Sequence, residues 1–246
     1  MVSMEVCANS VESAIEAQKG GALRVELCDN LLEGGTTASY AQIKLTKELV
    51  SISVYPIIRP RGGDFLYSEL EFELMKTDIA TCKKLNCEGV VFGILTASGE
   101  VDFERCKVLL AHAKPMKATF HRAFDMVNDQ FKALEQIIEL GFERILTSGA
   151  ETSALEGAER IEKLIQRSGG RIVIMPGAGI SIHNIAELIA KTGAKEFHGS
   201  AKAPVASAMT YCNPKLNMGG NRDEFVVEVT SALTVKNLIE LANSAE

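Results

Sequence analysis

The chain has 246 residues, of which 46% are hydrophobic, and it carries a formal net charge of −6 with a pI near 5.4. The acidic balance and the lack of a Lys/Arg run argue against nucleic acid or an anionic membrane surface as a partner. No stretch approaches the roughly 20 apolar residues of a membrane span, and the N-terminus lacks the apolar core of a signal peptide. We therefore expect a soluble, cytoplasmic protein with a large core.

Hydrophobic periodicity and capping signals divide the chain into alternating strands and helices. Strands are predicted at 4–8, 23–28, 52–58, 89–95, 117–121, 143–147, 171–175 and 196–198. Helices are predicted at 9–17, 39–50, 68–85, 102–113, 128–140, 153–168 and 181–192, with capping boxes at Ser39, Ser68 and Ser153. Beyond the last strand we expect a polar loop at 203–222, a short segment at 225–229 and a helix at about 233–242.

Eight strand–helix alternations in about 250 residues predict parallel strands with helical crossovers that close into a (β/α)8 TIM barrel. An open doubly wound sheet is the alternative, but no Gly-x-Gly-x-x-Gly follows the first strand. We expect one domain over 1–246, with the barrel at about 1–200 and a tail at 201–246 that includes a closing helix.

Polar side chains gather at the C-terminal ends of the predicted strands, whereas the N-terminal ends carry little of this kind. The set comprises Glu5, Glu26, Arg59, Arg61, Thr119, His121, Thr147, His198 and Ser200. In a barrel these ends converge on one face, where active sites lie. The pattern predicts a site for a polar ligand.

The segment 57–65 (IIRPRGGDF) has two arginines at alternate positions. If the strand continues, Arg59 and Arg61 point the same way and clamp a carboxylate or phosphate. The alternative is structural, with Asp64 neutralising Arg61 and the glycines only turning the chain.

The remaining polar residues suggest different roles within an enzyme site. His121 is the best general acid/base, because an unperturbed histidine titrates near neutrality. Glu5 and Glu26 are candidate second bases or hydroxyl acceptors, although they could simply neutralise the two arginines. Gly177, Gly179 and Ser200 follow the last two strands, where barrels often bind phosphate.

Six cysteines are present, without Cys-x-x-Cys or zinc-finger spacing, and in a reducing compartment they should be thiols. Cys7 and Cys28 lie at equivalent places near the ends of consecutive strands. Two soft sulfur ligands favour Cu(I), whereas the alternative is two small buried hydrophobic residues. Cys82, Cys87, Cys106 and Cys212 are interpreted as structural.

Several motifs resemble the CutC family, which is named for copper homeostasis. They are 4–7 (MEVC), 24–28 (RVELC), 33–37 (EGGTT), 58–65 (IRPRGGDF), 119–125 (TFHRAFD) and 146–149 (LTSG). The resemblance runs from Met4 to about Ser200. It implies a TIM-barrel fold, a cytosolic location (nuclear as well in eukaryotes), homo-oligomers, and Cu(I) binding at Cys7 and Cys28.

Two hypotheses follow. In the first, the protein binds Cu(I) through Cys7 and Cys28 for copper homeostasis. In the second, it is an enzyme for a small phosphorylated or carboxylated metabolite, with Arg59 and Arg61 holding the anion and His121 moving a proton. Both sites would share one barrel mouth.

Overall fold

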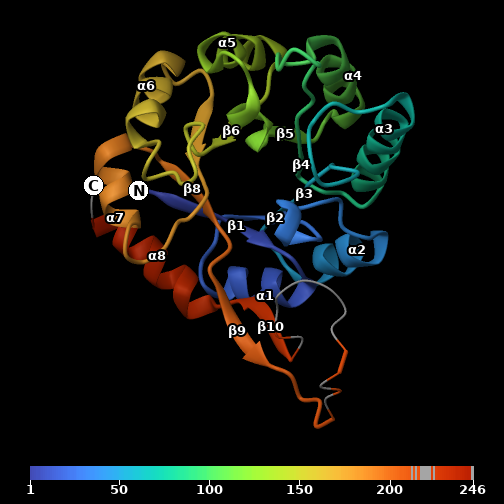
Figure 1. Cartoon of the computed structure of the whole chain (residues 1–246), viewed down its shortest axis with the longest axis vertical. Coiled ribbons are helices and arrows are strands. Elements are labelled where there is room, and N and C mark those ends of the chain that lie inside the picture. Colours follow the sequence, from blue (N-terminus) through green and yellow to red (C-terminus); the bar gives the residue numbers. More distant parts are fainter. Residues whose placement is uncertain (212, 214, 217–222, 224, 245–246) are drawn as a thin grey trace.

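A computed structural model describes residues 1–211, 213, 215–216, 223 and 225–244. In this part of the chain eight parallel strands form a ring inside a layer of helices, which confirms the predicted (β/α)8 TIM barrel (Figure 1). The strands are β1 (Ser3–Ala8), β2 (Arg24–Leu27), β3 (Ser53–Pro56), β4 (Gly89–Phe92), β5 (Lys117–Phe120), β6 (Arg144–Thr147), β7 (Val173–Pro176) and β8 (Glu196–Gly199).

The ring closes through two short bridges. The strands pair in the orders β3-β2-β1-β8 and β4-β5-β6-β7. Parallel bridges at Ile57–Val91 and Gly177–His198 join the two groups. All C-terminal strand ends therefore open on one face of the barrel.

Five of the seven crossover helices begin within two residues of the predicted start, whereas those predicted from 153 and 181 begin later. The seven helices are α1 (Val11–Lys19), α2 (Tyr40–Leu49), α3 (Glu69–Lys84), α4 (Phe103–Ala113), α5 (Gln130–Leu140), α6 (Ala158–Ser168) and α7 (Ile185–Thr192). Ser68 and Glu71 form a full capping box at α3. Ser153 and Glu156 also exchange capping bonds, yet α6 begins at Ala158, because Gly157 packs so closely against the Ser148 carbonyl that the intervening segment turns instead.

Alternation along the strands separates an outer core from the barrel interior. Outward residues such as Val6, Val25 and Phe197 pack under the helices in the large core. The inward residues Cys7, Cys28, Tyr55, Ile57 and Val91 form a separate apolar cluster. Six of the eight strands are shorter than predicted. Among them β3 ends at Pro56, so the two arginines that follow lie outside the strand.

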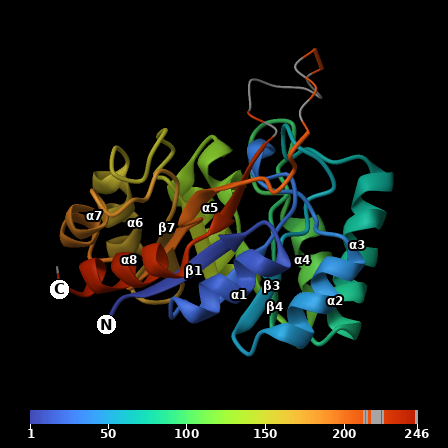
Figure 2. The ribbon, with the colours of Figure 1, turned by 90° about the horizontal axis from the view of Figure 1, so that it is seen from below.

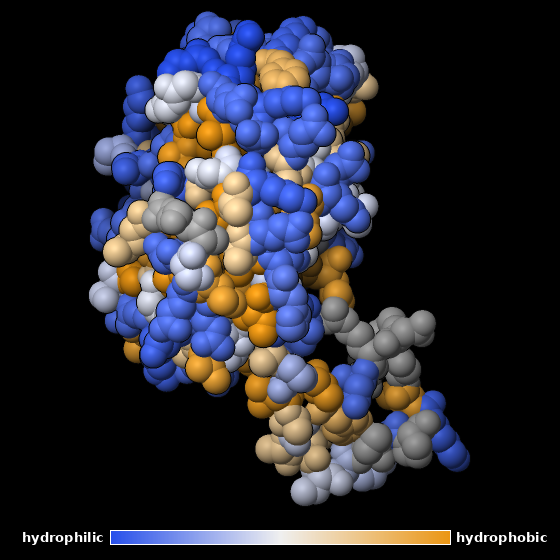
Figure 3. Space-filling model, turned by 90° about the vertical axis from the view of Figure 1, so that its left-hand side faces the viewer, coloured by the Kyte–Doolittle hydropathy of each residue, from blue (hydrophilic) through white to orange (hydrophobic). Residues whose placement is uncertain are grey.

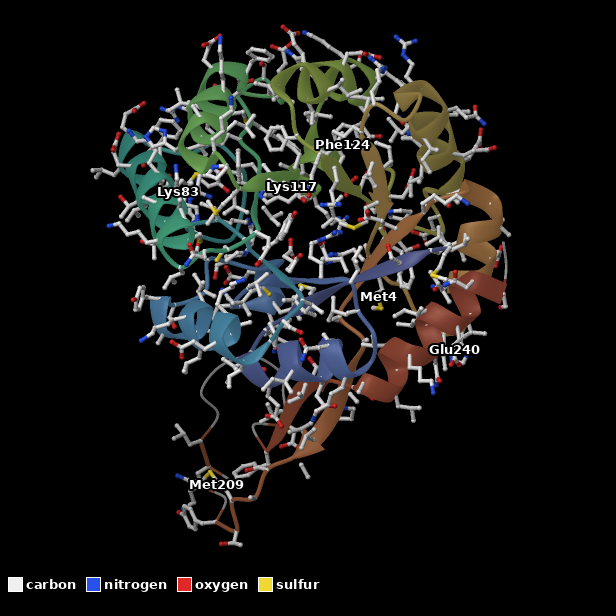
Figure 4. The ribbon with its side chains drawn as sticks, turned by 180° about the vertical axis from the view of Figure 1, so that it is seen from behind. Met4, Lys83, Lys117, Phe124, Met209 and Glu240 are labelled. Carbon is white, nitrogen blue, oxygen red and sulfur yellow. The ribbon has the colours of Figure 1, made fainter. Side chains whose placement is uncertain are left out.

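The segment predicted as a polar loop at 203–222 begins as a strand instead. β9 (Lys202–Ala206) pairs antiparallel with β10 (Val226–Thr230), and this hairpin projects from the barrel (Figures 1 and 2). Met209 lies at its far end (Figure 4), and Figure 3 shows apolar side chains gathered on it. Other residues of the predicted loop, Cys212 among them, lie outside the described residues.

The closing helix α8 (Ala232–Ser244) returns to the barrel beside α1 and α7. The Asn243 side chain accepts from the backbone N–H of Val2 and donates to its carbonyl, both at 2.9 Å. The described ends of the chain therefore lie together, as Figure 2 shows. Among the described residues, no helix has the length and apolar character needed to cross a bilayer.

Candidate metal and ligand site

A cavity of about 830 Å³ opens at the C-terminal ends of the barrel strands. Residues that follow four strands contribute to its wall, namely Ile57, His121, Gly179 and Ser200. Its other polar lining residues include Cys7, Glu26, Glu33, Arg59, Arg122, Asp125, Ser181, His183, His198 and Lys202. The cavity lies on the face where the sequence predicts a polar site, and it can hold a molecule much larger than a bare ion.

The two cysteines singled out in the sequence face each other inside the barrel. The Sγ atoms of Cys7 and Cys28 lie 3.6 Å apart, and the Cys7 thiol donates to Glu26 Oε2 at 3.3 Å. Cys7 reaches the cavity wall, whereas Cys28 is fully buried. The bond to Cys28, burial and the negative charge of Glu26 raise the pKa of the Cys7 thiol.

Glu5 links this region to the layer below it. Its carboxylate accepts from Nδ1 of His198 at 2.8 Å and forms a buried ion pair with Arg24. Burial alone would raise the pKa of Glu5, but Arg24 and His198 outweigh it and lower the pKa to about 2. Glu5 therefore neutralises Arg24, a different arginine from the two proposed from the sequence.

The Glu26 carboxylate lies next to both the Cys7 sulfur and the His198 ring. Nε2 of His198 lies 3.6 Å from Glu26 Oε2, and donor atoms of Cys7, Glu26 and His198 all fall within 4.8 Å of one another. Burial and the nearby Glu5 raise the pKa of Glu26. Burial opposes charge on His198, but Glu26 and Glu5 outweigh it and raise the pKa of His198.

The expectation that N-terminal strand ends carry little polar chemistry is wrong. Arg24, Arg144 and Glu196 are the first residues of β2, β6 and β8, and they form a buried ion network inside the barrel. Glu196 accepts from both arginines at 2.6 and 2.9 Å. The Arg24 guanidinium lies over the Tyr55 ring, with its carbon atom 5.3 Å from the ring centroid. These side chains form the floor of the barrel.

Arg59 and Arg61 do not point the same way, because β3 ends at Pro56 and the chain then turns. Arg59 is buried at the cavity wall and donates to the carbonyls of Glu33, Gly35 and Gly63. Arg61 instead contacts Asp64, Glu71 and Tyr67, and it is not one of the residues that line the cavity. The structural alternative, in which Asp64 pairs with Arg61, describes what is observed.

His121 lines the cavity, but the reason given for it as an acid/base does not hold in the fold. Burial and the Arg59 charge lower its pKa to about 3, so the ring is neutral near pH 7. Nδ1 accepts from the backbone N–H of Ala123 at 3.2 Å, which places the remaining proton on Nε2. Among the described residues, the buried Nε2 has no hydrogen-bond partner. His121 is thus a neutral donor beside the cavity.

Sequence reasoning missed Arg122, which follows His121 and lies at the cavity rim with a partly exposed side chain. Nε donates to Asp125 Oδ2 at 2.7 Å and Nη2 to Ser148 Oγ at 2.8 Å. Asp125 is held in turn by the backbone N–H of Ser148. The arginine and aspartate three residues apart in the TFHRAFD motif were the available signal.

The other predicted site residues are divided between lining and support. Gly179 and Ser200 line the cavity. Gly177 lies in the bridge to His198, where a Cβ would approach Leu146 Cδ1 to 2.5 Å, so this glycine permits close strand packing. Thr119 accepts from Arg144 at 3.4 Å, and Thr147 donates to Asp125.

Comparison with known proteins identifies the relatives of this chain. The model of the CutC family matches residues 2–203. A copper homeostasis protein cutC homolog from Mus musculus is 49% identical over 241 residues, covering 97% of this chain and 89% of the relative. The homolog from Homo sapiens is 48% identical over 243 residues, covering 98% of this chain and 89% of the relative.

Solved structures agree with the fold. The crystal structure of a putative copper homeostasis protein CutC from Streptococcus agalactiae is similar with a TM-score of 0.78 and 38% identity, covering 81% of this chain and 99% of that one. A thiamine phosphate pyrophosphorylase from Pyrococcus furiosus has a TM-score of 0.61 at 14% identity, covering 99% and 96% of the two chains, and this likeness concerns the fold alone.

Proposed function

Because the chain belongs to the CutC family, we propose that it serves copper homeostasis by binding Cu(I) through Cys7 and Cys28. The observation that carries this proposal is the 3.6 Å separation of the two sulfurs, of which that of Cys7 lies at the cavity wall. Thiolates are soft ligands that select Cu(I) over hard cations. A pair held by adjacent strands needs little rearrangement to share one ion.

The cavity gives the thiol pair a route to solvent. Cys7 reaches the cavity wall, so an incoming carrier of Cu(I) meets this sulfur first, and Cys28 lies behind it. Copper is the cargo here, and the protein loses a thiol proton on taking it up. Exchange through the one sulfur that lines the cavity suits a protein that passes the ion on.

A Cu(I) titration against a competing chelator under reducing conditions tests the proposal. The parent should bind one ion, and Cys7→Ser/Cys28→Ser should lose that binding. Cys82→Ser/Cys87→Ser is the matched control, because these two buried thiols also interact but lie under α3, away from the cavity. If the Cys7→Ser/Cys28→Ser variant binds Cu(I) as tightly as the parent, the proposal fails.

A second candidate function is the binding and conversion of a small phosphorylated or carboxylated metabolite. The cavity volume of about 830 Å³ favours it, because a bare ion uses little of this space. His121 offers an unpaired Nε2–H and Arg122 offers a guanidinium at the rim. Both are donors to anionic oxygen, and neutral His121 would stabilise charge on a ligand rather than shuttle a proton.

A thermal-shift panel of phosphate, sulfate and small carboxylates tests this second function. Binding should raise the melting temperature of the parent, because a ligand that binds only the folded state stabilises it. Arg122→Gln should reduce the shift, whereas Arg61→Gln, which lies outside the described lining, should leave it unchanged. Equal shifts in the parent and Arg122→Gln would remove Arg122 from the site.

The family resemblance also supports a cytoplasmic location, with a nuclear fraction in eukaryotes, and assembly into homo-oligomers. The reducing cytoplasm keeps free thiols available for Cu(I). The hairpin of β9 and β10 exposes Val205 and Val227 by more than half, and a second copy of the chain is the partner we propose for it. Light scattering should give the mass of an oligomer for the parent and a monomer for Val205→Lys/Val227→Lys.

A further inference from the structure

Three donor atoms of different chemistry converge on one point of the cavity wall, and they do not include Cys28. They are Sγ of Cys7, a carboxylate oxygen of Glu26 and Nε2 of His198. We infer that these three residues bind a divalent cation of borderline softness, such as Zn²⁺. This site shares Cys7 with the proposed Cu(I) pair but does not depend on copper binding.

The spacing of the donors fits a tetrahedral ion. Bond lengths of about 2.3 Å to sulfur and 2.0–2.2 Å to nitrogen and oxygen place tetrahedral ligands roughly 3.3–3.6 Å apart. The separation from Cys7 Sγ to Glu26 Oε2 is 3.3 Å, and that from His198 Nε2 to Glu26 Oε2 is 3.6 Å. The third separation, between Cys7 and His198, is at most 4.8 Å, so a small rotation of either side chain completes the triangle.

The protein already orients His198 as a metal ligand. Its Nδ1 donates to Glu5 Oε1 at 2.8 Å, and Glu5 is fixed by Arg24 below it. A hydrogen bond on one ring nitrogen leaves the lone pair on the other, and a carboxylate behind a histidine is the usual support of a zinc-bound imidazole. In the neutral ring the lone pair is therefore on Nε2, which lies 3.6 Å from Glu26 Oε2.

Glu26 brings a buried carboxylate to the same point of the cavity wall. Its side chain is 95% buried, it lines the cavity, and its Oε1 has no hydrogen-bond partner among the described residues. Burying a carboxylate oxygen without a partner is costly. Arg24, whose charge also acts on Glu26, is engaged by Glu5 and Glu196. A divalent cation at this point would compensate the carboxylate and a Cys7 thiolate together.

Three protein ligands leave a fourth position open toward the cavity. Structural zinc sites use four protein ligands, whereas sites that bind water or a substrate use three. A cavity of about 830 Å³ lies on the open side. The class of ligand for this position is therefore a small molecule that offers an oxygen, nitrogen or sulfur atom to the metal.

Paired titrations of the intact chain separate this site from the Cu(I) pair. The probes are Zn²⁺ and Cu(I), each against a chromophoric chelator, on the parent, His198→Gln, Glu26→Gln and Cys28→Ser. His198→Gln and Glu26→Gln should weaken Zn²⁺ more than tenfold and leave Cu(I) within threefold of the parent. Cys28→Ser should do the reverse. Glu5→Gln should weaken Zn²⁺ by about 10–100-fold through the loss of support for His198.

The absorption spectrum of the parent with Co²⁺ in place of Zn²⁺ tests the site without any substitution, so it does not depend on whether a variant folds. The expected spectrum shows intense tetrahedral d–d bands and a sulfur-to-cobalt charge-transfer band. Weak octahedral bands without charge transfer would overturn the inference, as would equal Zn²⁺ affinity in the parent and both His198→Gln and Glu26→Gln. Cu(I) binding that weakens in Cys28→Ser but not in His198→Gln or Glu26→Gln would leave the proposed copper function standing in either case.

Discussion

Glu5 is the residue at which the two layers of the barrel interior meet. Its carboxylate bonds upward to His198 at the cavity and downward to Arg24 in the floor. Both neighbours are buried, so neither charge has water to replace a lost partner. The orientation of His198 at the cavity therefore depends on Glu5, which does not itself line the cavity.

Removing Arg24 should destabilise the protein strongly. Arg24→Met leaves Glu5 and Glu196 buried with fewer cations, and breaking a buried ion pair from one side costs about 3–5 kcal/mol. Urea unfolding at pH 7 measures the loss. Arg167→Met removes a surface partner of Glu135 and should leave the unfolding midpoint nearly unchanged. Equal midpoints for the parent and Arg24→Met would contradict the role of the network.

The ion pair of Glu5 and Arg24 also predicts how the difference in stability between the parent and Arg24→Met changes with pH. The pKa of Glu5 is lowered from its usual value near 4.5 to about 2, so its stabilising effect is complete above pH 4.5 and is lost as pH falls toward 2. Arg24→Met removes the main cause of the lowering. The stability gap between parent and variant should therefore narrow as the pH falls from about 5 to 2, as measured by urea unfolding across that range.

The Cys7 thiol predicts a pH dependence for copper binding. Its raised pKa keeps it protonated near neutrality, so Cu(I) must displace the proton. Affinity should rise about tenfold per pH unit for each displaced proton between pH 6 and 8. Competition titrations corrected for the protonation of the chelator give the slope. A flat profile would mean that no thiol proton is released.

The two arginines of the IRPRGGDF motif should differ in their effect on stability. Arg59→Ala leaves three loop carbonyls without their charged donor and should cost about 2–4 kcal/mol. Arg61→Ala removes bonds from a side chain that is 38% exposed and should cost less than about 1 kcal/mol. Thermal or urea unfolding compares them, and an equal loss would show that Arg61 also supports the loop.

At the scale of elements, local signals in the sequence predicted the order of the strands and the starts of five of the seven crossover helices. Ser68 and Glu71 predict the start of α3 because the hydrogen bonds of the capping box join residues within one four-residue segment. The alternating pattern locates each strand for the same reason. The start of α6 was wrong because Gly157 contacts Ser148 of another segment, and such a contact cannot be inferred from local sequence.

The site was less predictable because its contacts join distant residues. His198 and Glu5 are 193 residues apart, and Arg144 and Glu196 are 52 apart. Their pairing depends on strand register around a closed ring. The projected Arg59–Arg61 pair failed for the opposite reason: it assumed that a strand continues where the chain turns at Pro56. Residue types at strand ends predict a site, but not which partners meet.

Gly89 tests how tightly one strand packs against the interior. A Cβ at this first residue of β4 would lie 2.3 Å from Cε2 of Tyr55, whose hydroxyl donates to Glu143 at 2.7 Å and so holds the ring. Gly89→Ala should cost about 1–3 kcal/mol in unfolding free energy. Gly199→Ala is the control on β8, because its nearest contact would be an ordinary 3.6 Å to Met4. Equal costs would contradict this account.

At the scale of the whole molecule, the barrel has two unlike ends. The C-terminal ends of the strands open into the cavity, whereas the N-terminal half of the interior is filled by Arg24, Arg144, Glu5 and Glu196. Arg24 and Arg144 are only 4% and 5% exposed. Charged side chains therefore fill one end of the barrel interior, and the cavity that can hold a ligand lies at the other end.

The charged side chains of the floor close one end of the barrel, so the cavity at the other end is the route to Cys7 that the described residues form. A ligand that enters this cavity after an ion has bound at Cys7 would lie on the route by which the ion leaves. A Cu(I) ion loaded first should depart more slowly once a small organic anion is seated above it. Stopped-flow transfer of Cu(I) to a chelator, with and without the anion, measures this delay, and identical rates would point to a second exit.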